Sequence, residues 1–397
     1  MRLLLLIGAI LAAGAVRAAP GLTEAEAVRR GLAQPDIATL LDARREAAAG
    51  RADAAGRWAN PEIEYSNEGL DLDSGTAEER YLWLTQRFNI AGVHGLERDA
   101  AASERQAENA RVDLKRRELV AEMRRLYYAA VAAEREAAAV SGWRDRLAQL
   151  AGAVASRARA GDASQFDALR LEKELALVSG EALDARAAAE SAADRLFSLL
   201  GSEPMPLAGG LLPPAAGSVE LATVLSGHPM LQALEAEVQA ASLSARAEQR
   251  RRWPELTLGV GRREFEDPEV SADGQLLSLG VEVPLFDNGS GEARAQSARS
   301  HQLQAERALL ETRLAVETRA VLRELRARRR AAITAREASA GRSLVSIAES
   351  AYDAGEVSVL ELIDAHRTEL SAQREAVRRA RAARQSYIQL QLIKGEL

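Results

Sequence analysis

Hydrophobic residues recur every seven positions through a long stretch of the first half of the chain. Val112, Leu119, Leu126, Ala133, Val140, Leu147 and Val154 form one stripe, and Met123, Ala130, Ala137 and Ala151 form a second beside it. A seven-residue repeat predicts a helix that packs on other helices as in a coiled coil. From about His94 to Ala158 this helix is about 97 Å long at 1.5 Å per residue, more than a compact globular domain needs.

Four short segments instead alternate apolar and polar residues, which is typical of β-strands. They are residues 61–69 and 80–88 in the first half and residues 254–265 and 275–286 in the second. Their length suits strands that cross a membrane in a barrel, although a soluble hairpin packed on helices has the same pattern. Four strands are too few to close a membrane barrel, which needs about eight, so membrane-spanning strands would require several copies of the chain.

Prolines and repeated landmarks divide the chain into two halves. Proline breaks helix interiors, and none occurs between Pro61 and Pro204 or after Pro284, so each half permits one very long helical tract. Three pairs of landmarks are 194 positions apart: Pro35 and Pro229, Gly161 and Gly355, and Gly201 and Gly395. One long period of this kind indicates an internal duplication.

The N-terminus has the pattern of a secretory signal peptide. Arg2 precedes an apolar run from Leu3 to Val16, and small residues suit cleavage after Ala18. The run has 14 residues, whereas a membrane anchor needs about 20, so an anchor is the weaker interpretation. We expect a signal peptide at 1–18, a first repeat at 19–203, a proline-rich linker at 204–218 and a second repeat at 219–397. The expected fold is mainly α-helical, with long helical hairpins and four β-strands.

Composition excludes several classes of function. Cysteine is absent, so neither disulfides nor thiol chemistry contribute, and the formal net charge of −6 is spread without basic blocks, which argues against nucleic-acid binding. His94, His228, His301 and His366 are far apart in the sequence and are expected to be surface or capping residues. We therefore expect no metal site and no cofactor, and the chain shows no set of nucleophile, base and orienting group typical of an enzyme.

Each long helical tract is interrupted once by glycine, an acidic residue and, two positions later, serine. The two breaks are residues 161–164 and residues 355–358. Glycine suits the left-handed residue that ends a helix, and serine suits the N-cap of the next one. One copy alone would indicate an ordinary helical hairpin, but the occurrence in both halves favours a shared role.

With this order of elements the chain resembles the TolC-like outer membrane factor family. The segments "GHPMLQALEAEVQAA" (227–241), "RRWPELTLGVGRREF" (251–265) and "VPLFDNGSGEARAQSAR" (283–299) are similar to the CzcC-type branch of that family. The resemblance implies a homotrimer in which twelve strands form an outer membrane barrel and the helices form an α-barrel tunnel through the periplasm.

The same resemblance implies a function and its partners. The chain would be the passive exit duct of a tripartite efflux system, working with a periplasmic adaptor protein and an inner membrane pump of the resistance-nodulation-division type. Heavy-metal cations are the candidate substrate. An exit duct for drugs or for type I protein secretion, and a soluble periplasmic coiled-coil scaffold or adaptor, are the alternatives.

Residues near the two breaks receive roles from the resemblance. The hairpin tips of the family dock the adaptor, and the docking candidates are Ala160, Gly161, Asp162, Ala354, Gly355 and Glu356. Pore-entrance carboxylates are implied at Glu361 and Asp364, where three copies of each would form rings that favour cations; solvated helix-face charges are the alternative. Hydrogen bonds that keep the entrance shut are implied at Asp167 and Tyr352. Some members carry a latch arginine where this chain has Val357.

Overall fold

The computed structural model describes residues 21–72, 75–340 and 343–396. The predicted signal peptide, residues 1–18, lies outside the described residues. The elements are α1 (Glu24–Leu32), α2 (Pro35–Ala54), β1 (Glu62–Leu72), β2 (Gly75–Asn89), α3 (Val93–Ala160), α4 (Gln165–Leu200), α5 (Leu221–Gly227), α6 (Pro229–Arg250), β3 (Glu255–Glu266), β4 (Ser271–Glu282), α7 (Ser290–Ser339), α8 (Leu344–Asp353) and α9 (Val359–Lys394). The prediction of a mainly helical chain with four strands is confirmed.

Some boundaries differ from those predicted. β1 and β2 extend into residues 70–79, which the sequence suggested as a loop, and β4 ends at Glu282 rather than near Phe286. Pro284 explains the early end of β4, because proline has no N–H to donate to a strand ladder. The long helical tract of the second half is also divided, since α7 ends at Ser339 and the Ser343 side chain accepts a hydrogen bond from the N–H of Ser346 at 3.2 Å to begin α8.

The chain forms two compact units, and each takes segments from both halves of the sequence. We call residues 21–31, 123–212, 333–340 and 343–381 the tip unit, and residues 32–72, 75–122, 213–332 and 382–396 the sheet unit. Helix α3, with 68 residues, contributes to both.

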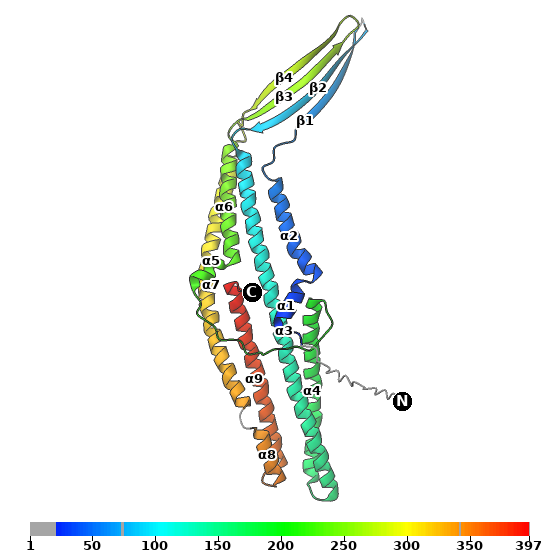
Figure 1. The fold of residues 1–397 in the computed structure, drawn as a ribbon, viewed down its shortest axis with the longest axis vertical. Helices are drawn as coiled ribbons and strands as arrows, with labels where there is room; N and C mark the ends of the chain where they lie inside the picture. The colour runs from blue at the N-terminus through cyan, green and yellow to red at the C-terminus, as the bar shows by residue number, and fades with distance from the viewer. Residues whose placement is uncertain (1–20, 73–74, 341–342, 397) are drawn as a thin grey trace, which may run out of the picture. The chain divides into compact units, whose positions relative to one another are not determined.

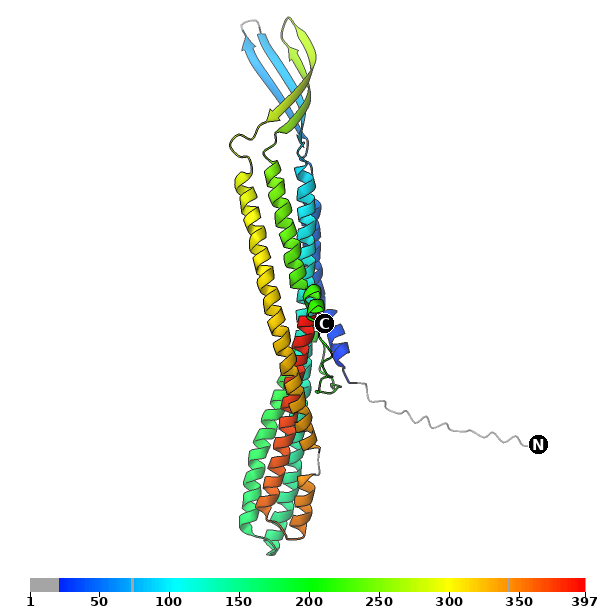
Figure 2. The ribbon, with the colours of Figure 1, turned by 90° about the vertical axis from the view of Figure 1, so that its left-hand side faces the viewer.

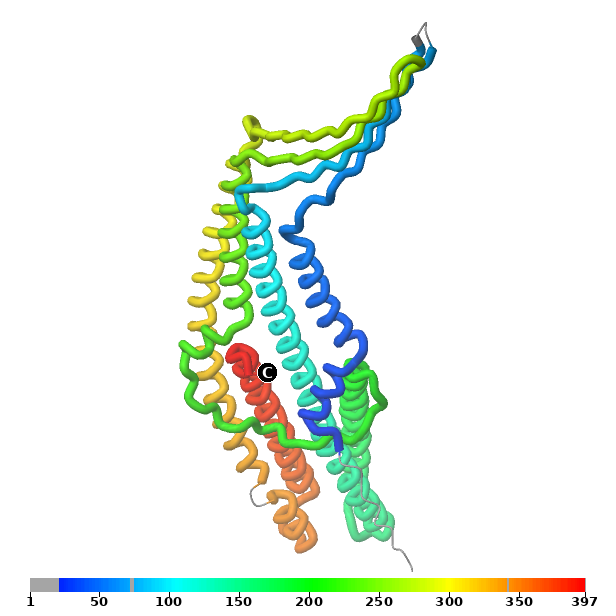
Figure 3. The backbone as a smooth tube through the Cα atoms, turned by 45° about the horizontal axis from the view of Figure 1, so that its top comes forward, coloured from blue at the N-terminus to red at the C-terminus, as the bar shows by residue number. Residues whose placement is uncertain are grey.

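The four strands of the sheet unit form one antiparallel sheet in the order β1-β2-β3-β4 (Figure 3). Every strand pairs with its neighbour in sequence, so β1 and β4 are the two edges. Edge strands present a row of unpaired N–H and C=O groups.

One face of this sheet carries an exposed apolar band, beside a polar part that holds Arg80, Arg262, Glu264 and Asp273. Cross-strand pairing puts Ile63, Leu84, Val260 and Leu277 in one row, and these side chains are 72%, 43%, 51% and 83% exposed. The adjacent row on the opposite face, Glu62, Thr85, Gly259 and Ser278, is polar or small. A soluble antiparallel sheet packs its apolar face on a core, whereas no helix among the described residues of the sheet unit lies over either face (Figure 1).

Four helices continue the four strands in the same order. α2 precedes β1, α3 follows β2, α6 precedes β3 and α7 follows β4. The contacts that fix the order α2–α3–α6–α7 are the ion pair of Arg44 with Glu108, the packing of Ala107 with Ala233, and the packing of Leu234 with Leu303. Helices α2 and α7 are therefore the outer helices of the sheet unit.

In the tip unit, α3, α4 and α9 share one core (Figure 2). Trp143 and Leu147 of α3, Leu171 of α4 and Ile363 of α9 lie in it and are at most 2% exposed. Helix α8 packs beside α3 and α9 through Ala348. The heptad stripe predicted for the second part of α3 thus points into this core.

We expect the same substitution at two glycines of α4 to have opposite effects on stability. Gly201 follows the helix with φ +60°, whereas Gly180 lies inside it and has open space where a Cβ would be. Gly201→Ala should destabilise by about 1 kcal/mol because of left-handed strain, and Gly180→Ala should stabilise by about 0.5–1 kcal/mol. Thermal unfolding followed by circular dichroism measures both, and shifts of the same sign would contradict the expectation.

Candidate functional site

The end of α3 is held by backbone hydrogen bonds that require a left-handed residue. Gly161 has φ +87°, and its N–H donates to the carbonyl of Ala158 at 3.2 Å. The N–H of Asp162 donates to the carbonyl of Arg157 at 2.9 Å. These two bonds form a Schellman motif, which satisfies the last carbonyls of a helix. The predicted break at residues 161–164 is therefore a capped helix end that turns the chain into α4.

The second break has the same structure. Gly355 has φ +77°, and its N–H donates to the carbonyl of Tyr352 at 2.9 Å. The N–H of Glu356 donates to the carbonyl of Ala351 at 2.8 Å. Gly201 and Gly395 end α4 and α9 with the same pair of bonds. A Cβ on Gly161 or Gly355 would meet nothing within 4 Å, so glycine is needed at the tips for its backbone conformation rather than for space.

A serine begins the helix after each tip, as the sequence predicted. The Ser164 hydroxyl accepts a hydrogen bond from the N–H of Phe166 at 3.1 Å. Ser358 and Glu361 form a capping box: the N–H of Glu361 donates to the Ser358 hydroxyl at 3.3 Å, and the Glu361 carboxylate accepts from the N–H and hydroxyl of Ser358 at 2.7 and 2.9 Å. Hydrogen bonds from the Ser358 backbone and hydroxyl lower the pKa of Glu361, so this carboxylate is ionised at neutral pH.

The other residues predicted at the tips lie at the surface. Ala160, Asp162, Ala354 and Glu356 flank the two glycines and are exposed. Asp364 is exposed on α9, and its spacing of three from Glu361 puts both carboxylates on one side of the helix. The structure therefore brings the two predicted entrance carboxylates together.

The two residues predicted as gate contacts do not bond to each other within the described residues. Tyr352 is partly buried against the core of the tip unit. Asp167 lies in the first turn of α4 and is also partly buried. Their roles at the entrance stay a prediction.

Two ion pairs that the sequence analysis missed connect α4 to α9. Arg367 donates two hydrogen bonds to the Glu174 carboxylate, one from Nη2 to Oε2 and one from Nε to Oε1, the latter at 2.8 Å. In the second pair, Arg374 Nη1 lies 3.1 Å from Glu181 Oε2. The Glu174 side chain is only 10% exposed, against 50% for Glu181, so the Glu174–Arg367 pair is the stronger of the two. The matching seven-residue spacing of the two glutamates and of the two arginines is the signal that could have found them.

A buried histidine lies on α9, close after the second tip. His366 is 4% exposed, and its ring stacks on Trp143 with centroids 4.1 Å apart and planes 19° apart. Burial lowers the pKa of His366 to about 4, and the positive charge of Arg146 acts in the same direction. The expectation of a surface histidine is wrong here, because the helical phase of α9 turns His366 inward with Leu362 and Ile363. His228 is also buried, at 8% exposed, but it lies between α5 and α6 as the C-cap of one and the N-cap of the other, so the expectation of a capping residue is confirmed there.

Comparison with known proteins assigns a family to the second half of the chain. The family model described as outer membrane efflux protein matches residues 221–396. This segment is an outer membrane efflux protein domain. The whole chain is 25% identical over 323 residues to the cobalt-zinc-cadmium resistance protein CzcC of Cupriavidus metallidurans, covering 78% of this chain and 74% of that protein. It is 30% identical over 262 residues to protein CyaE of Bordetella pertussis, covering 62% of this chain but only 55% of that protein.

Solved structures share the fold of this chain. CusC, described as undergoing transmembrane channel formation, superposes with a TM-score of 0.79 at 16% identity, over 94% of this chain and 91% of its own. The outer membrane protein VceC of Vibrio cholerae gives a TM-score of 0.71 at 16% identity, over 94% of this chain and 96% of its own. The predicted TolC-like fold is confirmed.

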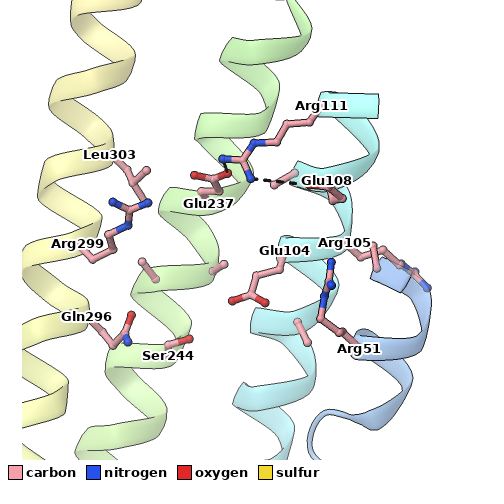
Figure 4. A pocket seen from close by; sticks show the side chains of 15 residues that line it. Arg51, Glu104, Arg105, Glu108, Arg111, Glu237, Ser244, Gln296, Arg299 and Leu303 are labelled. Carbon is pink, nitrogen blue, oxygen red and sulfur yellow. Dashed lines mark ion pairs between the residues drawn. The ribbon is translucent and has the colours of Figure 1, made fainter. Parts of the chain in front are cut away.

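Outside the tips, helices α2, α3, α6 and α7 line a groove of about 320 Å³ in the sheet unit (Figure 4). Arg111 there pairs with Glu108 and Glu237. The remaining charged side chains, among them Arg51 and Arg299, are exposed and of mixed sign. The groove shows no convergent set of groups that would bind one ligand.

Two absences concern the described residues only. No cluster of three or more His, Asp or Glu side chains with the geometry of a metal site occurs among them. None of their helices combines the length and the apolar character needed to cross a membrane.

We expect the protein to lose stability in mild acid through His366. The unfolded imidazole binds a proton near pH 6.5, whereas the folded one does so only near pH 4. The contribution to stability is therefore complete above pH 6.5 and falls by about 1.4 kcal/mol per pH unit as the pH decreases toward 4.

His366→Phe keeps an aromatic ring against Trp143 and removes this titration, so its unfolding free energy should depend less on pH. Urea unfolding of wild type and variant at pH 7.5 and pH 5 measures the difference. His301→Phe, at an exposed histidine of α7, is the control that should leave the pH dependence unchanged. Equal pH dependence in wild type and the His366 variant would contradict the assignment.

Proposed function

We propose that this chain is the outer membrane exit duct of a tripartite efflux system, and that it conducts substrate passively from the periplasm to the exterior. The observation that carries the proposal is the exposed apolar face of the four-stranded sheet. An apolar face is favourable in lipid, but the unpaired backbone groups of β1 and β4 are not. Copies of the chain would therefore pair β1 of one with β4 of the next until the sheet closes.

The proposed assembly is a homotrimer. Two copies would supply eight strands, which close a barrel only wide enough for side chains to fill. Three copies supply twelve and leave an open lumen. The polar or small residues opposite the apolar row, such as Gly259 and Ser278, suit the water-filled interior of such a barrel.

The two tips are proposed to dock a periplasmic adaptor protein. Residues 160–162 and 354–356 are exposed, and their Schellman motifs hold the backbone in one conformation, so an adaptor would meet preformed turns. The helical part would then extend into the periplasm, and an inner membrane pump of the resistance-nodulation-division type would supply the energy. Asp167 and Tyr352 are proposed as contacts that hold the entrance shut.

The proposed cargo is divalent heavy-metal cations. The similarity to a cobalt-zinc-cadmium resistance protein supports this choice. Glu361 and Asp364 support it as well, because three copies of each would put two rings of carboxylates at the entrance, and such rings favour cations.

The proposed domain organisation is a duplication, with repeats at 19–203 and 219–397 joined by a linker at 204–218. The support is structural: Gly161 with Gly355, and Gly201 with Gly395, occupy equivalent Schellman positions at the same separation. The element order of helix, two strands and long helix also occurs in both halves.

The function is tested by fractionation and conductance. We expect the full-length precursor, once exported, to be found in the outer membrane, to be extracted by detergent as a trimer, and to form pores in planar bilayers. A soluble monomer released by osmotic shock would instead support the periplasmic scaffold.

The entrance carboxylates are tested by removing their charge without truncating them. Glu361→Gln keeps the side chain that a capping box needs at that position, and Asp364→Asn removes the second ring. We expect the double variant to shift the reversal potential under a salt gradient toward zero, because the entrance loses six negative charges per trimer. Glu172→Gln, at an exposed residue of α4, is the matched control. An unchanged reversal potential in the double variant would put both carboxylates off the pore axis.

A further inference from the structure

The two outer helices of the sheet unit carry exposed apolar side chains that have no partner in the single chain. Leu40 of α2 is 47% exposed, and Leu309 and Val316 of α7 are 72% and 61% exposed. Within the described residues, no other helix of the sheet unit exposes a large hydrophobic side chain. The uncovered apolar surface is therefore confined to α2 and α7, the helices with a neighbour on one side only.

On each of these helices the exposed residues follow a coiled-coil spacing of alternating threes and fours. The α2 seam consists of Leu40, Ala43, Ala47, Gly50 and Ala54, all exposed. The α7 seam consists of Ala298, Gln302, Ala305, Leu309, Thr312 and Val316, also all exposed. In each seam the large residues are at the end farther from the strands in sequence. Most of the other seam residues are small, and small residues would let two such helices approach closely.

The sheet indicates which helices would meet. α2 leads into β1 and α7 follows β4, and these strands are the two edges of the sheet. The connectors have equal lengths, residues 55–61 and residues 283–289. If β1 of one copy pairs with β4 of the next, α2 and α7 are brought together as antiparallel neighbours.

We propose that the α2 seam of one copy packs against the α7 seam of the next copy around the ring. The proposal rests on the proposed assembly and adds the helix faces and the register to it. Leu40 lies 14 residues before the end of α2, and Ala305 lies 15 residues after the start of α7. Equal connectors therefore put Leu40 opposite Ala305.

Charges beside the seams favour this unlike pairing. Glu46 and Asp53 flank one side of the α2 seam, and Arg294 flanks the side of the α7 seam that meets it in an antiparallel pair. None of these three forms a side-chain ion pair within the described residues. Contact of α2 with α2, or of α7 with α7, would put like charges together, whereas unlike faces join head to tail and close a ring. The opposite flank of the α2 seam holds Arg44, which pairs with Glu108 in the same chain, and Arg51. That of the α7 seam holds Arg299, Glu306 and Arg313, so these flanks do not add to the preference.

The absence of cysteine from the chain allows a direct cross-linking test. Leu40→Cys and Ala305→Cys are combined in the full-length protein, which is oxidised in the outer membrane and run on a denaturing, non-reducing gel. We expect most of the protein to appear as covalent species of two and three chains. Each single variant, and Leu40→Cys combined with Gln304→Cys on a different face of α7, should remain at the size of one chain.

Two contrary results have different meanings. A detergent-extracted trimer without the Leu40–Ala305 cross-link, or a cross-link in a single variant, overturns this interface and leaves the exit duct intact. A soluble monomer overturns the exit duct and the interface together.

A charge exchange tests the same interface without cysteine. Arg294→Glu should lower the association constant of neighbouring copies by about two- to fivefold, the range of an exposed ion pair, and Asp53→Arg in the same chain should restore it. Dissociation of the trimer on dilution in detergent measures both. A double variant no more stable than the single ones would overturn the proposed register.

Discussion

The constraint on which the rest of the structure depends is an antiparallel sheet that has an apolar face and no core to place it on. Each large aliphatic side chain that leaves water contributes about 1.5–3 kcal/mol, whereas an exposed ion pair contributes about 0–1 kcal/mol. The free energy of removing the row from Ile63 to Leu277 from water is therefore larger than that of the surface ion pairs of the sheet, and it favours an apolar environment for this face. A lipid environment satisfies this face, but it makes the open edges of β1 and β4 costly, so one chain is an incomplete structure.

The outer helices of the sheet unit, like the outer strands, have a neighbour on one side only. Each strand continues into one helix in the same order, so the outer strands and the outer helices fall on the same two sides of the unit. The exposed side chains follow this rule, since Leu40 and Leu309 are on the outer helices and the inner helices α3 and α6 bury their large apolar residues. Closure of the sheet and burial of these helix faces would thus be one event.

Local chemistry was readable from the sequence, and pairing between distant segments was not. Gly161 and Ser164 indicate a helix end and a helix start through local preferences, the left-handed backbone of glycine and the capping hydroxyl of serine. The heptad stripe of α3 indicates which face of that helix is buried. The Glu174–Arg367 pair joins residues 193 positions apart, and its existence depends on which faces of α4 and α9 meet. His366 was misjudged because its polarity suggests the surface, while the phase of α9 and the ring of Trp143 put it inside.

The tips combine a rigid backbone with contacts that can separate. Schellman bonds at Gly161 and Gly355 and the Ser358–Glu361 capping box are formed within single turns, so moving one helix against another does not break them. The Glu174–Arg367 pair, in contrast, joins α4 to α9, and one of its partners is nearly buried. If Arg367 moved away while Glu174 stayed buried, an unpaired buried carboxylate would remain, which costs more than losing a surface ion pair. If the proposed entrance opens, the resistance would thus lie between the helices, and the turns at the tips would move as preformed pieces.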